Sequence, residues 1–133
     1  MHWEFDLQYS LPLMEKCAYT YYGCCEALDN KIDMLKRIPN LRKIGVSPWA
    51  NVEKCAEQTG KDYVLARKPN PAYVAIKTDP EVVRKETAQT VEAALKYGCP
   101  CEFVLKDIST VGFNPQNLII WAKTVSEILD EYY

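Results

Sequence analysis

Thr20-Tyr21-Tyr22-Gly23-Cys24-Cys25-Glu26 is the stretch that decides the fold, because a β-prone run stops there in a glycine and a polar cluster. Aromatic and β-branched residues favour strands, and glycine often closes them. Counting back to Lys16, we expect a strand over 16–22. The same plan then recurs along the chain: an apolar run ends in polar residues, and a capped helix follows.

Three further short runs have the composition of strands. They cover 43–47, which stops at Pro48, 62–68, which stops at the rigid turn Pro69-Asn70-Pro71, and 101–106. Helices are expected from Asp29 or Asn30 to Ile38, over 51–59, from Asp79 to Tyr97 and from Asn114 onward, with a leading helix over 1–15. Residues that cap helices stand at these starts, such as Asp79 before Pro80.

Strands that alternate with helices predict a parallel sheet joined by right-handed crossovers, so the expected fold class is α/β. The leading helix and four βα units over 16–133 make a single domain, and four such units are half of a TIM (β/α)8 barrel. A half barrel leaves two strand edges and its inner face uncovered. We therefore expect it to form a homo-oligomer, in the simplest case a dimer, to swap elements, or to open into a flatter sheet.

Composition narrows the class of function. The chain has 133 residues, 48% hydrophobic and 26% charged, which is ordinary for a globular protein. Its net charge of −2 is too small to indicate nucleic acid or a membrane surface as a partner. It contains no run as long as a membrane span and no signal-peptide pattern, so we expect a cytoplasmic protein. In that reducing compartment, the six cysteines are core residues or metal ligands.

A family resemblance rests on two stretches. The run YYGCCEALDNKIDMLKRIPNLRKIGVSPWANVEKCAEQTGKDYVLARKPNPA at 21–72, followed by CEFVLKDISTV at 101–111, resembles the C-terminal half of the uroporphyrinogen decarboxylase-like superfamily. That superfamily includes decarboxylases and zinc-dependent methyltransferases that work on corrinoid proteins or methyl donors, and the similarity is strongest on the methyltransferase side. Its members are barrels about twice this length or more, so the resemblance implies a fragment that forms the second half of one.

The resemblance also implies a metal site. In the methyltransferases, a strand ends in a His-x-Cys-Gly pattern whose His and Cys bind zinc. Here Cys24 matches the zinc cysteine, Tyr22 stands where His is expected, and Cys25 replaces the Gly. The only histidine, His2, is far from that position in the sequence, so a variant zinc site would consist of Cys24, Cys25 and Glu26. Thiolate and carboxylate are ligands that zinc accepts, and a catalytic zinc keeps one position open for substrate.

Each metal candidate has a simpler interpretation. Neighbouring residues of a strand point to opposite faces, so Cys24 and Cys25 share a metal only if the turn after Gly23 bends. Otherwise one is buried and the other lies in a helix–strand contact. Glu26 can instead be a first-turn acid that favours the helix dipole. We expect the remaining cysteines to be structural, with the first two in the core: Cys17, Cys55, Cys99 and Cys101.

The catalytic candidates are Lys68, Asn70 and Asp107, which fall at the predicted carboxyl ends of strands, where barrels of this kind place their active sites. Asn70 lies between two prolines and can instead shape a turn. Asp107 follows Lys106 and can instead form a solvated ion pair. Trp49 also follows a strand, and it either lines a pocket or covers the barrel rim.

The function that the resemblance implies is methyl transfer that uses zinc and a thiol or corrinoid acceptor, the corrinoid being held by a partner protein. The isolated chain is expected to be inactive, because half of the barrel and its loops would be missing. Two alternatives stay open. One is a uroporphyrinogen-type decarboxylase. The other is a non-enzymatic, self-associating module in which half barrels pair across a two-fold axis.

Overall fold

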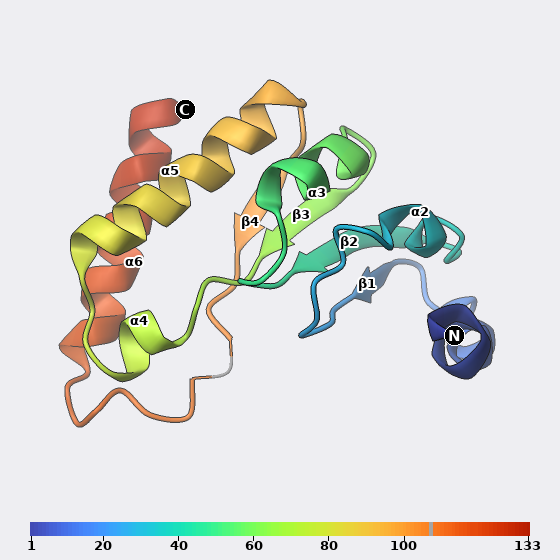
Figure 1. The fold of residues 1–133 in the computed structure, drawn as a ribbon, viewed down its shortest axis with the longest axis horizontal. Helices are drawn as coiled ribbons and strands as arrows, with labels where there is room; N and C mark the ends of the chain where they lie inside the picture. The colour runs from blue at the N-terminus through green and yellow to red at the C-terminus, as the bar shows by residue number, and fades with distance from the viewer. Residues whose placement is uncertain (107) are drawn as a thin grey trace.

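The computed structural model describes residues 1–106 and 108–133. It has an α/β fold in which four parallel strands alternate with helices, as in half of a βα barrel (Figure 1). The strands lie in the sheet in chain order and are β1 Thr20–Tyr22, β2 Leu41–Val46, β3 Val64–Arg67 and β4 Cys101–Phe103. The predicted fold class is confirmed.

The helices follow the predicted alternation. A π-helical turn Trp3–Leu7 and α1 Gln8–Met14 precede β1. β1 is followed by α2 Ile32–Leu35 and β2 by α3 Val52–Thr59. β3 is followed by α4 Ala72–Ala75 and α5 Pro80–Lys96, and β4 by α6 Gln116–Tyr132. Two caps explain where the longer connecting helices begin. The Asn51 side chain accepts from the Lys54 amide at 3.0 Å, and the Asp79 side chain accepts from the Glu81 amide at 3.0 Å.

Several elements are shorter than predicted. The first strand begins at Thr20 instead of Lys16, because the end of α1 continues into turns in which the Cys17 amide donates to the Met14 carbonyl. Helix α2 ends at Leu35, and a tighter turn follows before Asn40, whose φ of 57° reverses the chain into β2. Local hydrogen bonds thus replace the regular patterns that composition favours.

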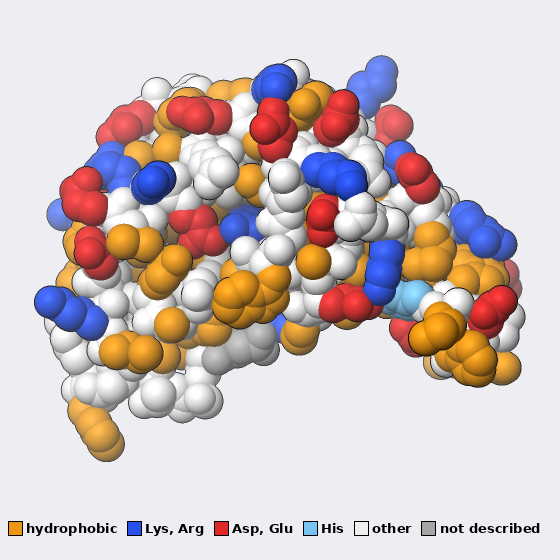
Figure 2. Space-filling view, in the orientation of Figure 1, with side chains coloured by type: hydrophobic (Ala, Val, Ile, Leu, Met, Phe, Trp, Pro, Cys, Tyr) orange, Lys and Arg blue, Asp and Glu red, His pale blue; other side chains and the backbone are white. Residues whose placement is uncertain are grey.

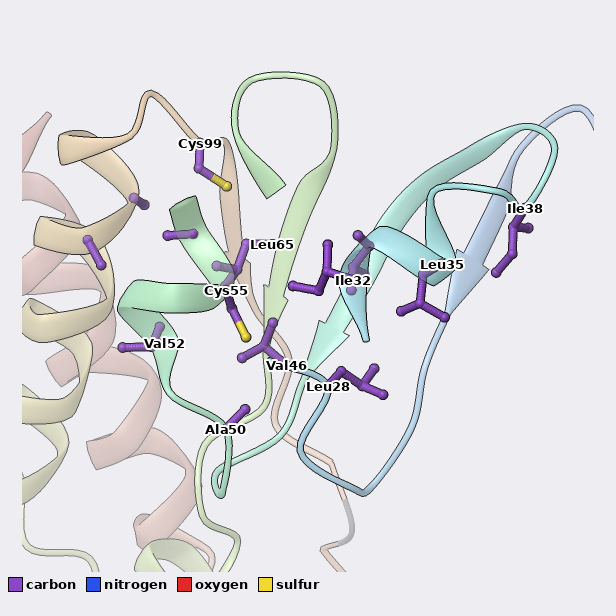
Figure 3. Packing of buried hydrophobic residues seen from close by; sticks show 14 of the residues in the cluster. Leu28, Ile32, Leu35, Ile38, Val46, Ala50, Val52, Cys55, Leu65 and Cys99 are labelled. Atoms are coloured by element: carbon purple, nitrogen blue, oxygen red, sulfur yellow. The ribbon is translucent and has the colours of Figure 1, made fainter. Parts of the chain in front are cut away.

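The helices cover one face of the sheet. Helices α2, α3 and α5 lie on this face, and α6 packs against α5 (Figure 1). Figure 3 shows buried side chains from these helices meeting those of the strands, including Ile32 from α2, Cys55 from α3 and Leu65 from β3, all with no exposed surface. Outside this core, acidic and basic side chains are intermixed over the helical layer (Figure 2).

The opposite face carries both polar and apolar side chains and is partly exposed. We call it the open face, and it consists of the residues that alternate with the core-facing ones: Tyr19, Tyr21, Lys43, Gly45, Val64, Ala66 and Glu102. Tyr19 is 76% exposed and Tyr21 45%. The Lys43 ammonium binds the Glu102 carboxylate at 2.6 Å, and this ion pair crosses β3. In a complete barrel this face would point inward. None of the helices in the described ranges is long and apolar enough to span a bilayer.

The cysteines are all free thiols, and their burial differs from one to the next. Cys55 is fully buried and Cys99 is 4% exposed, as the sequence predicts. The prediction that Cys17 lies in the core is wrong. Its thiol is exposed and donates to the Leu13 carbonyl in the turn after α1, because the chain leaves the helix before it reaches the sheet.

A buried ion pair joins the sheet to the helical layer. Arg67, 5% exposed, donates to the Ser47 carbonyl at 2.7 Å and to the Glu86 carboxylate of α5 at 2.7 Å. One guanidinium thus connects the ends of β3 and β2 to α5. Losing one partner of a buried pair leaves an uncompensated charge away from water.

We therefore predict that Glu86→Gln lowers the free energy of unfolding by about 3 kcal/mol. The matched control is Glu127→Gln, which removes a carboxylate that pairs with Arg84 on the surface. This variant should lower the free energy of unfolding by less than about 1 kcal/mol. Urea unfolding followed by circular dichroism measures both. Equal losses in the two variants would contradict the structural role given to Arg67.

Burial raises the pKa of the Cys55 thiol from 9.0 to about 12, with the Asp29 charge adding to the effect. The folded chain therefore keeps a proton that the unfolded chain loses above its ordinary pKa. Stability from this thiol is complete below the unfolded value and falls as pH rises toward the folded one. Between about pH 8 and pH 10.5, the urea midpoint should fall more for the wild type than for Cys55→Ala. If the urea midpoints of the two proteins fall equally with pH, the burial of the Cys55 thiol does not contribute to this loss of stability.

Candidate functional site

A small pocket lies at the carboxyl ends of the strands, the edge at which βα barrels place their active sites. We call it the rim pocket. Its volume is about 130 Å³, and its lining residues follow β1, β2, β3 and β4: Cys25, Ser47, Pro48, Trp49, Lys68, Pro69, Pro71 and Lys106. Segments that are far apart in the chain thus converge here because parallel strands end at the same edge.

Lys68 follows β3 and runs over the neighbouring strands. It is 5% exposed, and its ammonium donates to the Cys24 carbonyl at 3.4 Å and lies 5.7 Å from the centre of the Tyr21 ring. A Cβ atom on Gly45 would lie 2.9 Å from this nitrogen, and one on Gly23 would lie 3.1 Å from it. The two glycines, one on β2 and one after β1, therefore provide the space that the lysine occupies.

Cys25 and Lys106 meet on another wall of the rim pocket. The Lys106 ammonium, beyond β4, donates to the Cys25 sulfur at 2.9 Å. Ser47 follows β2 and is fully buried, and its hydroxyl has no hydrogen-bond partner within the described residues. Trp49 is 71% exposed and lines the rim pocket, which is one of the two places that the sequence leaves open for it.

Cys24 and Glu26 lie in a different place. They line a second pocket together with residues of the N-terminal segment: Met1, His2, Phe5, Asp6, Tyr22 and Lys31. The Glu26 carboxylate binds the Lys31 ammonium at 2.7 Å and lies 3.2 Å from His2 Nδ1, while His2 Nε2 lies 2.6 Å from the Tyr22 hydroxyl. His2 is far from this site in the sequence but adjacent to it in space.

The charges around this second pocket shift two pKa values. The hydrogen bond from Lys31 holds the pKa of Glu26 below its usual value. Burial, together with the negative charge of Asp6, raises the pKa of Tyr22 well above its usual value. At neutral pH the tyrosine hydroxyl therefore stays protonated and can donate a hydrogen bond, while the glutamate stays ionised and bound to lysine.

The three residues predicted to bind zinc do not converge. Cys24 and Glu26 line the second pocket, whereas Cys25 lines the rim pocket and accepts from Lys106. Among the residues that the structure describes, no group of three or more His, Cys, Asp or Glu side chains is placed to hold a metal ion. The arrangement does not fit a zinc ion bound by this set, so we derive no chemical step from zinc, and the metal site stays a prediction.

Of the three residues predicted to be catalytic, the two that the structure describes lie in different surroundings. Lys68 lines the rim pocket, as its place after a strand suggests. The Asn70 side chain accepts from the Ala72 amide at 3.0 Å, two residues further along, so its contact matches the turn-shaping alternative. Asp107 lies outside the described residues. Sequence reasoning did not name Ser47 and Lys106 as site residues, although each is the last residue of a predicted strand and that position was the available signal.

Comparison with known proteins adds no further evidence. No family model, curated protein or solved structure matches the chain. The family resemblance drawn from the sequence therefore stays a prediction, and the function has to be argued from the geometry of the two pockets.

We predict that Gly45→Ala destabilises the protein more than Gly23→Ala. At 45 the added Cβ meets the Gly23 backbone at 3.1 Å as well as the lysine nitrogen, whereas at 23 it meets only side-chain atoms, which can move. An added methyl group that meets backbone atoms in a packed region lowers the free energy of unfolding by about 1–3 kcal/mol. Urea unfolding of the two variants measures the difference, and equal stability would contradict the close approach of Gly45 to the Gly23 backbone.

Proposed function

We propose that this chain is one half of a cytoplasmic βα-barrel enzyme of the uroporphyrinogen decarboxylase-like superfamily. The complete barrel would transfer a methyl group to a thiol or corrinoid acceptor, the corrinoid being held by a partner protein. The observation that carries the proposal is the rim pocket, in which a thiol and two ammonium groups meet at the carboxyl ends of parallel strands. This is the location of the active site in barrels of this type.

Two ammonium groups are among the described residues that line the rim pocket, and neighbouring cations favour a thiolate. A substrate thiol placed there would lie near the ammonium groups of Lys68 and Lys106, which favour its thiolate form. The thiolate sulfur attacks the methyl carbon and forms the new S–C bond, while the donor keeps the electron pair of the bond that breaks. In this scheme the lysines hold the charge of the acceptor and do not themselves react.

The half-barrel interpretation rests on the edges and the open face of the sheet. β1 and β4 each have one neighbour in the sheet, and the open face carries partly exposed tyrosines. A second copy related by a two-fold axis along the barrel would pair β4 with the β1 of its partner and keep all strands parallel. We propose this dimer, and we expect no catalysis from the chain alone because the other loops of the active site belong to the missing half.

The decarboxylase alternative has one observation in its favour. The ammonium groups of Lys68 and Lys106 would attract the carboxylates of a tetrapyrrole. The volume of about 130 Å³ belongs to one half of the proposed barrel and does not decide between the two substrates. We rank methyl transfer first because the family resemblance is strongest on the methyltransferase side. The non-enzymatic pairing module remains the alternative if the chain dimerises and no complete enzyme exists.

Native mass spectrometry of protein purified without chelator tests the proposal, since one spectrum reports both subunit number and bound metal. We expect a dimer, because pairing covers the strand edges and the open face. A monomer would contradict the half-barrel interpretation. Zinc that is present in the wild type and lost in Cys24→Ser would show that the predicted ligands converge in solution.

A parallel assay tests the chemistry. The chain is incubated with methylcobalamin and 2-mercaptoethanol, and loss of the methylcobalamin absorbance is followed. We expect no transfer above the protein-free rate, and measurable transfer would contradict the expected inactivity of the isolated half. Tight binding of a carboxylated porphyrin would favour the decarboxylase.

A further inference from the structure

The helical segment that precedes β1, Trp3–Leu7 with α1, is a fixed part of the fold. Its inner side packs against the core, where Leu7 is fully buried, and the Arg37 guanidinium lies 3.6 Å from the centre of the Trp3 ring. These contacts hold the segment in the helical layer, beside β1 at one edge of the sheet (Figure 1). Its outer side is therefore presented in one orientation.

The outer side of this segment is apolar. We call it the leading stripe, and its four side chains are between 68% and 90% exposed: Met1, Phe5, Tyr9 and Leu13. They are spaced four residues apart, so they follow one another along one side of the helical turns. Figure 2 shows hydrophobic side chains gathered around the histidine at this end of the molecule. Exposed apolar patches of this kind mark surfaces that bind a protein or a membrane.

The charges of the segment favour a protein over a membrane. Within residues 1–15 the charged side chains are all acidic, and they are Glu4, Asp6 and Glu15. Helices that lie on a lipid surface carry lysine and arginine on their polar side, because these residues are attracted to anionic headgroups. A stripe flanked by carboxylates lacks that attraction. The remaining candidates are protein surfaces, and the fold itself offers one.

A second copy of the chain has an apolar surface at the matching place. β1 and β4 are the two edges of the sheet, and the leading stripe lies beside β1 while α6 follows β4 (Figure 1). In the proposed dimer, β4 of each copy pairs with β1 of the other, and this brings the leading stripe of one copy to α6 of the other in the same outer layer. α6 has exposed apolar side chains toward both of its ends: Leu118, Ile119 and Tyr133.

The area of these surfaces meets what a stable dimer requires. A large side chain buries roughly 150–250 Å², so four that are mostly exposed present on the order of 500 Å². Two-fold symmetry repeats each contact, and each copy would bury its leading stripe and a similar area of α6, on the order of 1,000 Å² in all. A stable interface buries about 800 Å² per partner. β1 and β4 have three residues each, too few to supply this area by edge pairing alone.

We propose that the leading stripe binds α6 of a second copy, and that this helix contact, made twice, holds the two half barrels together. The inference rests on the proposed dimer and names the surface that stabilises it. Phe5 and Tyr9 lie in the middle of the stripe, and buried aromatic side chains contribute most to interfaces of this kind. Strand pairing then sets the register, while the helices supply the area.

Sedimentation velocity of the full chain over a concentration series measures the dimer dissociation constant. Phe5→Glu and Tyr9→Glu should each raise this constant at least about tenfold, because a carboxylate would be buried against α6. The matched control is Ile76→Glu, since Ile76 is 79% exposed, close to the 78% of Phe5, but follows α4 and lies outside the leading stripe and α6. This variant should change the constant less than about threefold. Circular dichroism checks that every variant folds.

A new charge pair tests whether α6 is the surface that the stripe binds. Ile119→Lys should weaken the dimer when it is the only change, as Phe5→Glu does. When both changes are in one chain, the new carboxylate of one copy lies near the new ammonium group of the other. The double variant should therefore dimerise at least about threefold more tightly than Phe5→Glu alone.

The possible failures differ in what they show. A wild-type chain that stays monomeric at every concentration overturns the proposed dimer and the inference with it. A wild-type dimer that Phe5→Glu and Tyr9→Glu do not weaken overturns the inference alone. If the stripe variants weaken the dimer but Ile119→Lys does not, the stripe binds another surface and the assignment to α6 is wrong. Wild-type binding to phosphatidylcholine vesicles that is lost in Phe5→Glu would identify a lipid surface and would also overturn the inference.

Discussion

The ion pair between Arg67 and Glu86 is the contact on which the arrangement of the strand ends depends. The same guanidinium holds the Ser47 carbonyl, so one residue fixes the end of β3 against both β2 and α5. The next residue, Lys68, points to the other face and runs over Gly45 of β2 and Gly23 after β1. Two consecutive cations at one strand end thus serve different purposes: Arg67 stabilises the helical layer, and Lys68 supplies charge to the rim pocket.

The alternation of strands and helices was predictable because each element carries a strong local signal. Asn51 and Asp79 cap the helices where the sequence places them, and the apolar runs become the core strands. The boundaries were less predictable, since they depend on contacts that composition does not record. The turn after α1 takes up the first part of the expected first strand and leaves Cys17 exposed. The Asn70 side chain binds the Ala72 amide in the turn before α4.

The site was predictable in position and less so in composition. Strand ends pointed to Lys68 and Trp49, and both line the rim pocket. The separation of Cys24 from Cys25 matches the alternation of neighbouring side chains in an extended chain, which directs one thiol to each pocket. His2 reaches Tyr22 only through the packing of the first helix. Contacts between distant segments of this kind have no signature in a local pattern.

The pair formed by Lys43 and Glu102 has a consequence for whatever covers the open face. These side chains cross β3 on the face that would point inward in a closed barrel, so the barrel would enclose an ion pair there and would not have an entirely apolar interior. Surfaces of this kind associate through complementary charge and bridging water, and salt screens their attraction. Two halves joined in this way would bind reversibly, and their association would weaken as ionic strength rises.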